Sequence, residues 1–283
     1  MNKKLFAALF ATLVLEASVY AQTEANFKVD VTPDGSGVII TGYTGTVAAV
    51  RIPATIQNIP VREIGDEAFG ESSIITSIII PVGVTKIGKL AFGTCKKLTS
   101  VTIPEGITEI GAYAFYGCTA LTAVTLPEGL ETIGNNAFLN CTALASAITL
   151  PQSLKTLGAN AFSKSGITSV TILGDITNFL LDGPQSTAFA ECAKLRTVTL
   201  GEGVKVIPAA MFAGCPALTT VTFPASITQI DAVAFIQCAA LTTVTIPDSV
   251  ASINFANYGE FQGTKLSVAS QAALRKRGYT AGF

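Results

Sequence analysis

The side chains that most often carry chemistry in proteins are sparse in this sequence. Its 283 residues include no histidine, so the commonest general base is missing, together with the Ser-His-Asp and Cys-His arrangements. Four glutamates that recur at matching places could form a carboxylate pair, but solvated turns of the repeat are the simpler explanation. They are Glu105, Glu109, Glu128 and Glu131. No Walker-type phosphate loop occurs, and Gly201-Glu202-Gly203 is typical of a turn. The sequence therefore predicts no enzyme activity and no cofactor.

The cysteines have a spacing that bears on chemistry. They fall in two runs at intervals of 23 residues, separated by Ser165: Cys95, Cys118, Cys141, Cys192, Cys215 and Cys238. An even count permits disulfides in an oxidising compartment. However, residues at one place in successive repeats have parallel Cβ directions, and three in a row leave one unpaired. A line of thiols without histidine is also a poor tetrahedral zinc site. We expect a buried column of free cysteines and no metal.

These cysteines belong to a repeat that runs through most of the chain. The clearest copies start at Val101 and Val124, and less regular copies start at Val50, Ile78, Ile148, Val170, Val198, Val221 and Val244. One phenylalanine marks each copy: Phe69, Phe92, Phe115, Phe138, Phe162, Phe189, Phe212 and Phe235. Their spacings of 23, 23, 23, 24, 27, 23 and 23 lie in the range of leucine-rich repeats.

The first part of a copy has the pattern of a strand. Val101 and Ile103 are two residues apart and should point to one side, with Ser100 and Thr102 on the other. Pro104 should end the strand because it has no N–H to donate.

The rest of a copy returns to the same interior. Ile107 and Ile110 should point inward, and Gly111 should permit a turn of unusual φ. The segment 114–118 has helical or 3₁₀ spacing, and Leu121 closes the coil. A single copy cannot bury its own apolar side, so successive copies must stack around one core.

The pattern LxxVxIPxxIxxIGxxAFxxCxxLxx resembles the BspA-like leucine-rich repeat of bacterial surface proteins, over roughly residues 50 to 265. The resemblance implies an α/β solenoid with a parallel β-sheet on the concave face and short helical or 3₁₀ turns opposite. It also implies export, and adhesion or protein binding as the activity.

The two ends of the chain differ from the repeat. Lys3 and Lys4, an apolar run over 5–15 and Val19-Tyr20-Ala21 together predict a signal peptide over 1–21. Residues 22–49 contain two apolar runs around Pro33–Gly37, which predicts a β-hairpin cap. Residues 266–283 predict a capping helix and a tail, ending in three basic residues that suit the helix dipole or an anionic surface.

The solenoid itself should span residues 50–265, with an irregular insert near 173–188 where Leu173-Gly174 replaces proline. This copy is longer than the others, so the insert should bulge from the convex side or distort the stack. No transmembrane span is expected after the signal peptide, because Pro and Gly break the apolar residues into short runs. A net charge of -1 without clustered basic residues gives no reason to expect a nucleic-acid partner.

The outward strand positions are the candidate ligand-binding residues. They are Ser100, Thr102, Thr125, Thr149, Ser169, Thr171, Thr197, Thr199, Thr220, Thr222, Thr243 and Thr245. Strand propensity alone explains threonine at such positions. The functional interpretation is a neutral, hydroxyl-rich surface for an extracellular or envelope protein or glycan. This surface lacks the Trp, Tyr and Arg that anchor tight interfaces, so weak or avidity-dependent binding is expected.

Two other functions fit the same pattern. One is a structural protein of the cell envelope without a specific ligand. The other is an ice-binding array, because Thr-x-Thr occurs in three late strands, although the expected curvature would spoil the match to a flat lattice. The oligomeric state and the choice between cell surface, secretion and periplasm stay open.

Overall fold

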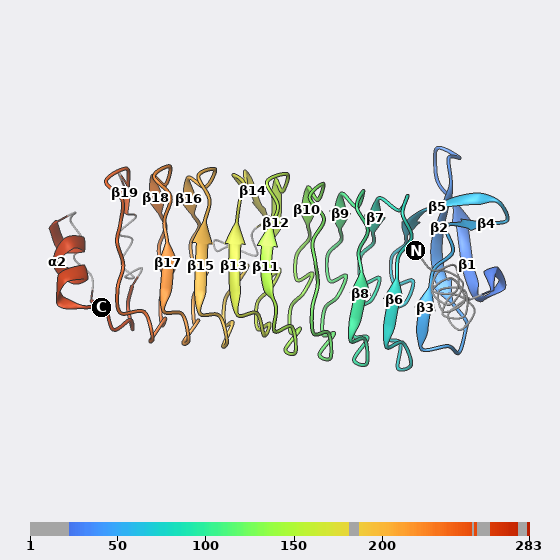
Figure 1. Cartoon of the computed structure of the whole chain (residues 1–283), viewed down its shortest axis with the longest axis horizontal. Helices are drawn as coiled ribbons and strands as arrows, with labels where there is room; N and C mark the ends of the chain where they lie inside the picture. The colour runs from blue at the N-terminus through green and yellow to red at the C-terminus, as the bar shows by residue number, and fades with distance from the viewer. Residues whose placement is uncertain (1–22, 181–186, 251, 254–260, 277–281) are drawn as a thin grey trace, which may run out of the picture.

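The computed structural model is one row of stacked coils, with the N-terminal strands at one end and helix α2 at the other (Figure 1). It describes residues 23–180, 187–250, 252–253, 261–276 and 282–283. The expected signal peptide, residues 1–21, lies outside these residues, as does part of the expected insert. The parallel, repeat-built solenoid expected from the sequence is confirmed.

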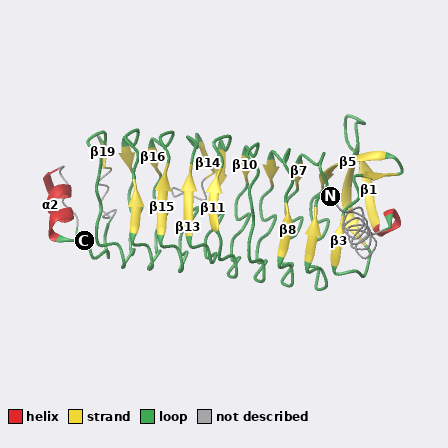
Figure 2. Cartoon of the chain, viewed as in Figure 1, coloured by secondary structure: helices red, strands yellow, loops and turns green. Residues whose placement is uncertain are grey.

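Each regular coil contributes two short strands, and equivalent strands of neighbouring coils pair in parallel (Figure 2). The first strands are β3 (Ala49–Arg51), β6 (Ser77–Ile79), β8 (Ser100–Thr102), β11 (Ala147–Leu150), β13 (Ser169–Ile172), β15 (Thr197–Leu200) and β17 (Thr220–Thr222). The second strands are β5 (Ile59–Ile64), β7 (Lys86–Ile87), β9 (Glu109–Ile110), β10 (Thr132–Ile133), β12 (Thr156–Gly158), β14 (Asn178–Leu180), β16 (Val206–Ile207), β18 (Gln229–Ile230) and β19 (Ser252–Ile253).

The sequence predicts the first ladder of strands but not the second. Most second strands have only two or three residues, too few for an alternating pattern to be recognised. They form because a coil that pairs through its first strand places its next extended segment beside the equivalent segment of its neighbour. Where both ladders are present, each coil is therefore held to the next along two separate lines of backbone hydrogen bonds.

A column of phenylalanine rings fills the core, as the repeat predicts. From Phe69 to Phe235 successive rings stack with centroids 4.9–5.5 Å apart, and Phe261 extends the column at 5.6 Å. Seven of the eight predicted phenylalanines are fully buried, and Phe69 is 3% exposed. This spacing follows from the separation of paired parallel strands, ~4.8 Å, which brings rings of adjacent coils into contact.

The segment around each core phenylalanine is a series of turns, whereas helical or 3₁₀ geometry was expected. In one coil, Tyr113 (φ 58°) and Gly117 (φ 66°) lie on either side of Phe115 and have left-handed backbone conformations. Residues of a right-handed helix do not adopt such conformations. The N–H of Phe115 donates to the carbonyl of Ala137 in the next coil, at 2.7 Å. Alternate N–H groups of this segment therefore bond to the next coil, and those between them, as in Tyr116 to Tyr113, close turns to the carbonyl three residues earlier.

The cysteines form the predicted buried column, and all of them are free. Each Sγ–H donates to the carbonyl of a core phenylalanine in the preceding coil, with Sγ–O distances of 3.0–3.2 Å. The buried Ser165 occupies the same place in the coil that lacks a cysteine. Burial raises the pKa of Cys95 to about 11 and the pKa of Cys141 and Cys238 to about 12.

The reason expected for Gly111 is wrong. Its φ is not in the left-handed region, so the turn makes no special demand on it. Instead, a Cβ at Gly111 would lie 2.7 Å from the carbonyl carbon of Gly88 and 2.8 Å from the amide nitrogen of Lys89. Glycine is needed here because the backbones of two coils approach too closely for a side chain. Gly134 and Gly158 have still closer backbone neighbours, Ala112 and Gly134 respectively.

Different elements cover the two ends of the stack. At the N-terminus, η1 (Glu24–Asn26) precedes an antiparallel hairpin of β1 (Phe27–Val31) and β2 (Val38–Tyr43), and the short β4 (Thr55–Ile56) pairs with β5. Strand β2 pairs in parallel with β5, and Tyr43 lies 5.7 Å from Phe69 between ring centroids. At the other end, α2 (Val268–Lys276) packs through Ser270 and Leu274.

The long copy disturbs the second ladder. Residues Asn178–Leu180 form β14, which pairs in parallel with β12 and so adds one more strand to the second ladder. This part of the insert therefore belongs to the stack. Beyond it, β14 and β16 are not paired, and the ladder continues as a separate sheet of β16, β18 and β19. The first ladder is unbroken here, because β13 pairs with β15 along four residues.

Substitution of glycine by alanine will show that inter-coil distance governs position 111. Gly111→Ala should lower the free energy of unfolding by roughly 1–3 kcal/mol, because backbone atoms of the preceding coil must move. Gly129→Ala is the control, since the Cβ that alanine adds there meets no atom within 4 Å and its φ is not left-handed. Guanidinium unfolding followed by circular dichroism measures both. Equal effects at the two positions would contradict this explanation.

The buried thiols should be unreactive in the folded protein. At pH 8 iodoacetamide should modify none of the six cysteines in the folded protein and all of them in the protein unfolded by guanidinium.

The same thiols should make stability depend on pH. Because the pKa values of Cys95, Cys141 and Cys238 are raised above the ordinary 9.0, these thiols favour the folded state below pH 9. Stability should then fall as the pH rises from 9 toward 12. Mass spectrometry of the alkylated protein and unfolding curves at each pH provide the measurements.

Candidate ligand-binding face

All the predicted ligand-binding residues point away from the core. We call their outward side chains the hydroxyl face. Eight are exposed: Ser100, Thr102, Thr125, Thr149, Thr220, Thr222, Thr243 and Thr245. Four are half-buried: Ser169, Thr171, Thr197 and Thr199. The residues between them, such as Val170, Val198 and Val221, are buried, which confirms the strand orientation expected from the sequence.

The structure brings only part of this set into one regular array. On β11, β13, β15 and β17 the pairing places Thr149, Thr171, Thr199 and Thr222 side by side. A second row, two residues earlier, joins Ser169 to its partners on β15 and β17. Neighbours within a row are about 4.8 Å apart, and the two rows about 6.6 Å apart.

The remaining members lie outside that array. Ser100 and Thr102 belong to a separate sheet of β3, β6 and β8. Thr125 lies in the coil between the two sheets, where a single bridge between Ser100 and Ala123 replaces a strand pair. Thr243 and Thr245 follow β17 in a segment that has no regular strand.

Two columns of threonine differ in what their hydroxyls do. In the column one residue before the hydroxyl face, Thr99, Thr122 and Thr219 donate to a backbone carbonyl of the preceding coil at 2.9–3.1 Å. On the hydroxyl face, within the described residues, the contact between Thr220 and Thr219 is the sole hydrogen bond of a side-chain hydroxyl. The first column serves the fold, and the second keeps its hydrogen-bonding capacity for solvent or a ligand.

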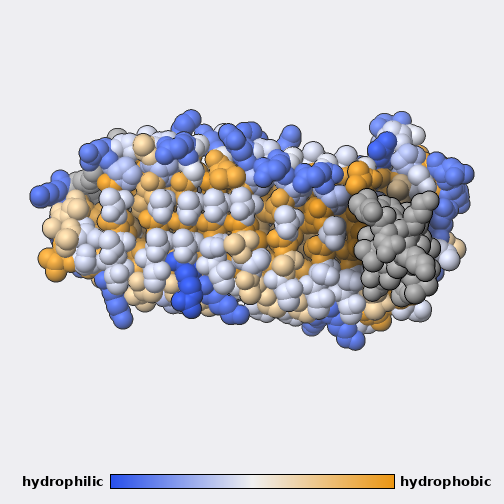
Figure 3. All heavy atoms as spheres, viewed as in Figure 1, coloured by the Kyte–Doolittle hydropathy of each residue, from blue (hydrophilic) through white to orange (hydrophobic). Residues whose placement is uncertain are grey.

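Apolar surface is visible between the polar rows. Figure 3 shows pale side chains in rows on this side of the molecule, with orange surface between them. Val101, Ile103, Phe223 and Ile246 are half-buried and pack against the core, so part of each remains accessible. A ligand on this face would meet alternating hydroxyl and apolar groups.

The sequence-based expectation that this surface lacks arginine is wrong at one end. Strand pairing places Arg51 of β3 next to Ile79 of β6, and Ile79 next to Thr102 of β8. The exposed Arg51 therefore continues the outer row of the hydroxyl face. The signal was available, because Arg51 follows Val50 as Thr102 follows Val101 in the repeat.

A groove adjoins the C-terminal end of the face. It lies between the segment Thr243–Ile246 and α2 and encloses about 680 Å³ of empty space, part of it open to solvent. Ala269 and Ala273 line its helical side, so small side chains keep it open. The buried Ser270 accepts a hydrogen bond from the N–H of Val244 at 3.2 Å, which joins the helix to the last coil.

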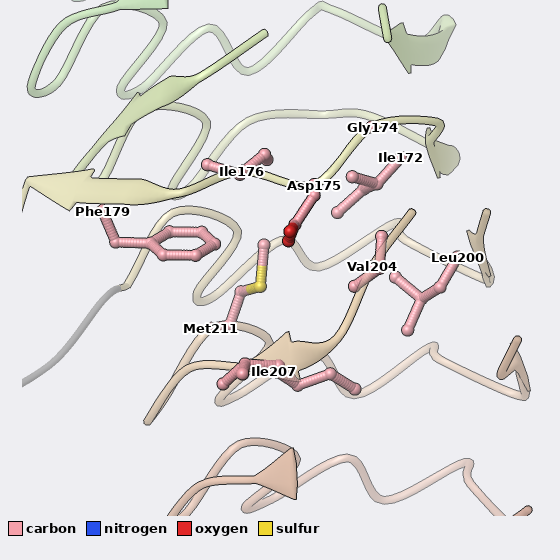
Figure 4. A pocket seen from close by; sticks show the side chains of 10 residues that line it. Ile172, Gly174, Asp175, Ile176, Phe179, Leu200, Val204, Ile207 and Met211 are labelled. Atoms are coloured by element: carbon pink, nitrogen blue, oxygen red, sulfur yellow. The ribbon is translucent and has the colours of Figure 1, made fainter. Parts of the chain in front are cut away.

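A smaller hollow lies beside the insert, where the second ladder divides. Figure 4 shows Ile176 and Phe179 of one coil facing Ile207 and Met211 of the next. The hollow has a cavity volume of about 10 Å³, far below the usual size of a ligand pocket. Among the described residues that line it, Asp175 is the one ionisable group.

The charge on Asp175 is already engaged. Its carboxylate lies 3.3 Å from the ammonium of Lys205, which belongs to the next coil. In the described residues, no group of three or more metal-ligating side chains comes together. Within the same residues, no helix combines the length and apolar character needed to cross a bilayer.

Known proteins similar to this chain share its repeat. The family model "BspA type Leucine rich repeat region" matches residues 62–182 and 184–270 in 6 copies. A leucine-rich repeat protein of T. pallidum is 28% identical, with a TM-score of 0.61 over 93% of this chain and 98% of that one.

Two further solved structures are similar at lower scores. A leucine-rich cell surface protein of Faecalibacterium prausnitzii is 22% identical, with a TM-score of 0.45 over 93% of this chain and 98% of that one. The pneumococcal vaccine antigen PcpA is 22% identical, with a TM-score of 0.43 over 87% and 80%. No curated protein matches the sequence. The family match covers most of the repeat region, and the chain therefore belongs to the BspA-type leucine-rich repeat family.

Proposed function

We propose that the chain is an exported binding protein, not an enzyme, whose hydroxyl face contacts a protein or glycan of the envelope or the extracellular space. The observation that supports this most is the difference between the two threonine columns. Thr99, Thr122 and Thr219 use their hydroxyls within the fold, whereas Thr199 and Thr222, for example, leave theirs available in register. Family membership supports a binding role, because solenoids of this kind bind through extended repeat surfaces.

The composition of the face favours weak binding that is strengthened by repetition. A hydrogen bond to an exposed hydroxyl contributes about 1 kcal/mol, so several rows must act together. The half-buried apolar residues add contact area, and Arg51 supplies a charged contact at one end. Several copies on a surface would raise the effective affinity further.

Stability measurements test whether the side-chain hydroxyls of the hydroxyl face are free of hydrogen bonds within the fold. Thr222→Val keeps the β-branched shape and should change the free energy of unfolding by less than about 0.5 kcal/mol. Thr219→Val removes the hydrogen bond to the carbonyl of Arg196 and should reduce the free energy of unfolding by about 1 kcal/mol. Denaturant unfolding curves of the two variants measure these changes. A larger loss of stability for Thr222→Val than for Thr219→Val would show that the hydroxyl face has a structural role.

Binding measurements test whether the hydroxyl face is the contact surface. The immobilised protein should retain a component of cell-envelope or host extracellular-matrix extracts. Thr199→Glu with Thr222→Glu should weaken retention at least tenfold, because two desolvated charges would enter a neutral contact surface. The matched control is Thr119→Glu with Thr142→Glu. These two threonines are exposed, as Thr222 is, but they lie on the turns and not on the first strands.

Each other outcome supports a different function. Retention that both double variants preserve would place the binding surface elsewhere. No retention from any extract favours a structural envelope protein. Thermal hysteresis of the purified protein, abolished by Thr199→Glu with Thr222→Glu, favours the ice-binding alternative.

A further inference from the structure

The turn side of the solenoid has a hollow that the hydroxyl face does not include. It has a cavity volume of about 340 Å³, which is within the usual range for ligand sites. It spans three successive coils, with Glu67 and Glu71 from one, Leu90 and Thr94 from the next, and Tyr116 from the third. We call it the Tyr116 trough.

The trough exists because the repeat changes at one position. The residue after each core phenylalanine is Gly70, Gly93, Tyr116, Leu139 and Ser163 in five successive coils. Two successive coils have glycine at this place, so no side chain fills the trough there. The next coil has Tyr116 instead, and its side chain forms one wall of the trough.

The floor of the trough is apolar. A Cβ at Gly93 would lie 2.7 Å from Cδ2 of Leu90, and a Cβ at Gly70 would lie 3.1 Å from its carbonyl oxygen. Leu90 is therefore next to both glycines, with its side chain at Gly93 and its carbonyl at Gly70, and this half-buried residue lines the trough. Such a floor suits the aliphatic part of a long side chain.

The rim has negative charge that the chain does not neutralise. Glu67 and Glu71 are exposed, and in the described residues neither carboxylate has an ion-pair partner. Glu191, which occupies the place of Glu71 in a later coil, does pair, with Lys164 at 3.6 Å. The carboxylates at the trough are thus complementary to a cation from outside the chain.

The wall is an aromatic ring held in place. Tyr116 is half-buried and meets Tyr113 edge to face, with ring centroids 5.7 Å apart. Its backbone carbonyl accepts a hydrogen bond from the N–H of Thr94 at 2.6 Å, which ties the coil to the one before. A tyrosine face attracts a flat cation, and arginine stacks on it better than lysine does.

We propose that the Tyr116 trough binds an arginine side chain presented by a partner protein. The guanidinium lies against the Tyr116 ring and pairs with Glu67 and Glu71, and its methylene groups cover Leu90. Tyrosine and arginine are the residues that most often anchor interfaces. The trough is therefore a second contact site, separate from the hydroxyl face and independent of whether that face binds a ligand.

The test uses the peptide acetyl-Gly-Arg-Gly-amide and its citrulline analogue, which keeps the shape without the charge. Titration of the ¹⁵N-labelled full chain should shift the amide signals of Gly93 and Tyr116, with a dissociation constant on the order of 1 mM for the arginine peptide. The citrulline peptide should bind at least tenfold more weakly. Equal shifts with both peptides, or shifts that avoid the trough, overturn the proposal.

Variants then assign the contacts. Glu67→Gln with Glu71→Gln should weaken arginine binding about tenfold, whereas the matched control Glu191→Gln should leave it unchanged. Gly93→Leu should abolish binding without altering charge, because it fills the trough with the residue the chain has at the equivalent Leu139. The atom that must move for it is Cδ2 of Leu90, the end of a flexible side chain, so this variant should fold. Undiminished binding to either trough variant, with folding shown by circular dichroism, refutes the assignment.

Discussion

The distance between successive coils is the constraint on which the rest of this structure depends. Parallel strands joined by backbone hydrogen bonds lie ~4.8 Å apart, and both ladders impose this separation on every coil they join. At that separation phenylalanine rings stack at 4.9–5.6 Å, and thiols reach the carbonyls of the preceding coil. The same closeness excludes even a Cβ where the backbones meet, as at Gly111. The stacked phenylalanine core, the buried column of cysteines and the need for glycine where backbones meet all follow from this one distance.

The chain varies where that constraint is relaxed. The second ladder divides between β14 and β16, while the first continues through the same coils, so the stack keeps one line of pairing at the insert. The first ladder is interrupted around Thr125, where the second continues from β9 to β10. The first ladder also ends at β17, where the second continues from β18 to β19. Because the interruptions of the two ladders fall at different coils, no pair of coils in the described solenoid loses both ladders together. Irregular features are tolerated when one set of hydrogen bonds remains.

The regular and the irregular surfaces have different potential for recognition. The hydroxyl face repeats one weak group many times, which suits an extended ligand and binding that increases with contact length. The Tyr116 trough arises from a departure from the repeat, and it combines an aromatic ring, an apolar floor and two carboxylates in one place. Such a site suits a single side chain. A solenoid can hold both kinds of site because each coil contacts only its neighbours, so a local change does not propagate.

What the sequence determined by itself follows from its period. Copies about 23 residues apart are enough to align the core phenylalanines, to place the cysteines in a buried column and to turn the threonines outward, because alternation within a strand is a local property. The tertiary structure alone decided the second ladder, the turns in place of helices, the true role of Gly111, and the trough. Each depends on distances between residues in different coils, and those distances are set by the stacking of backbones and not by neighbours along the chain.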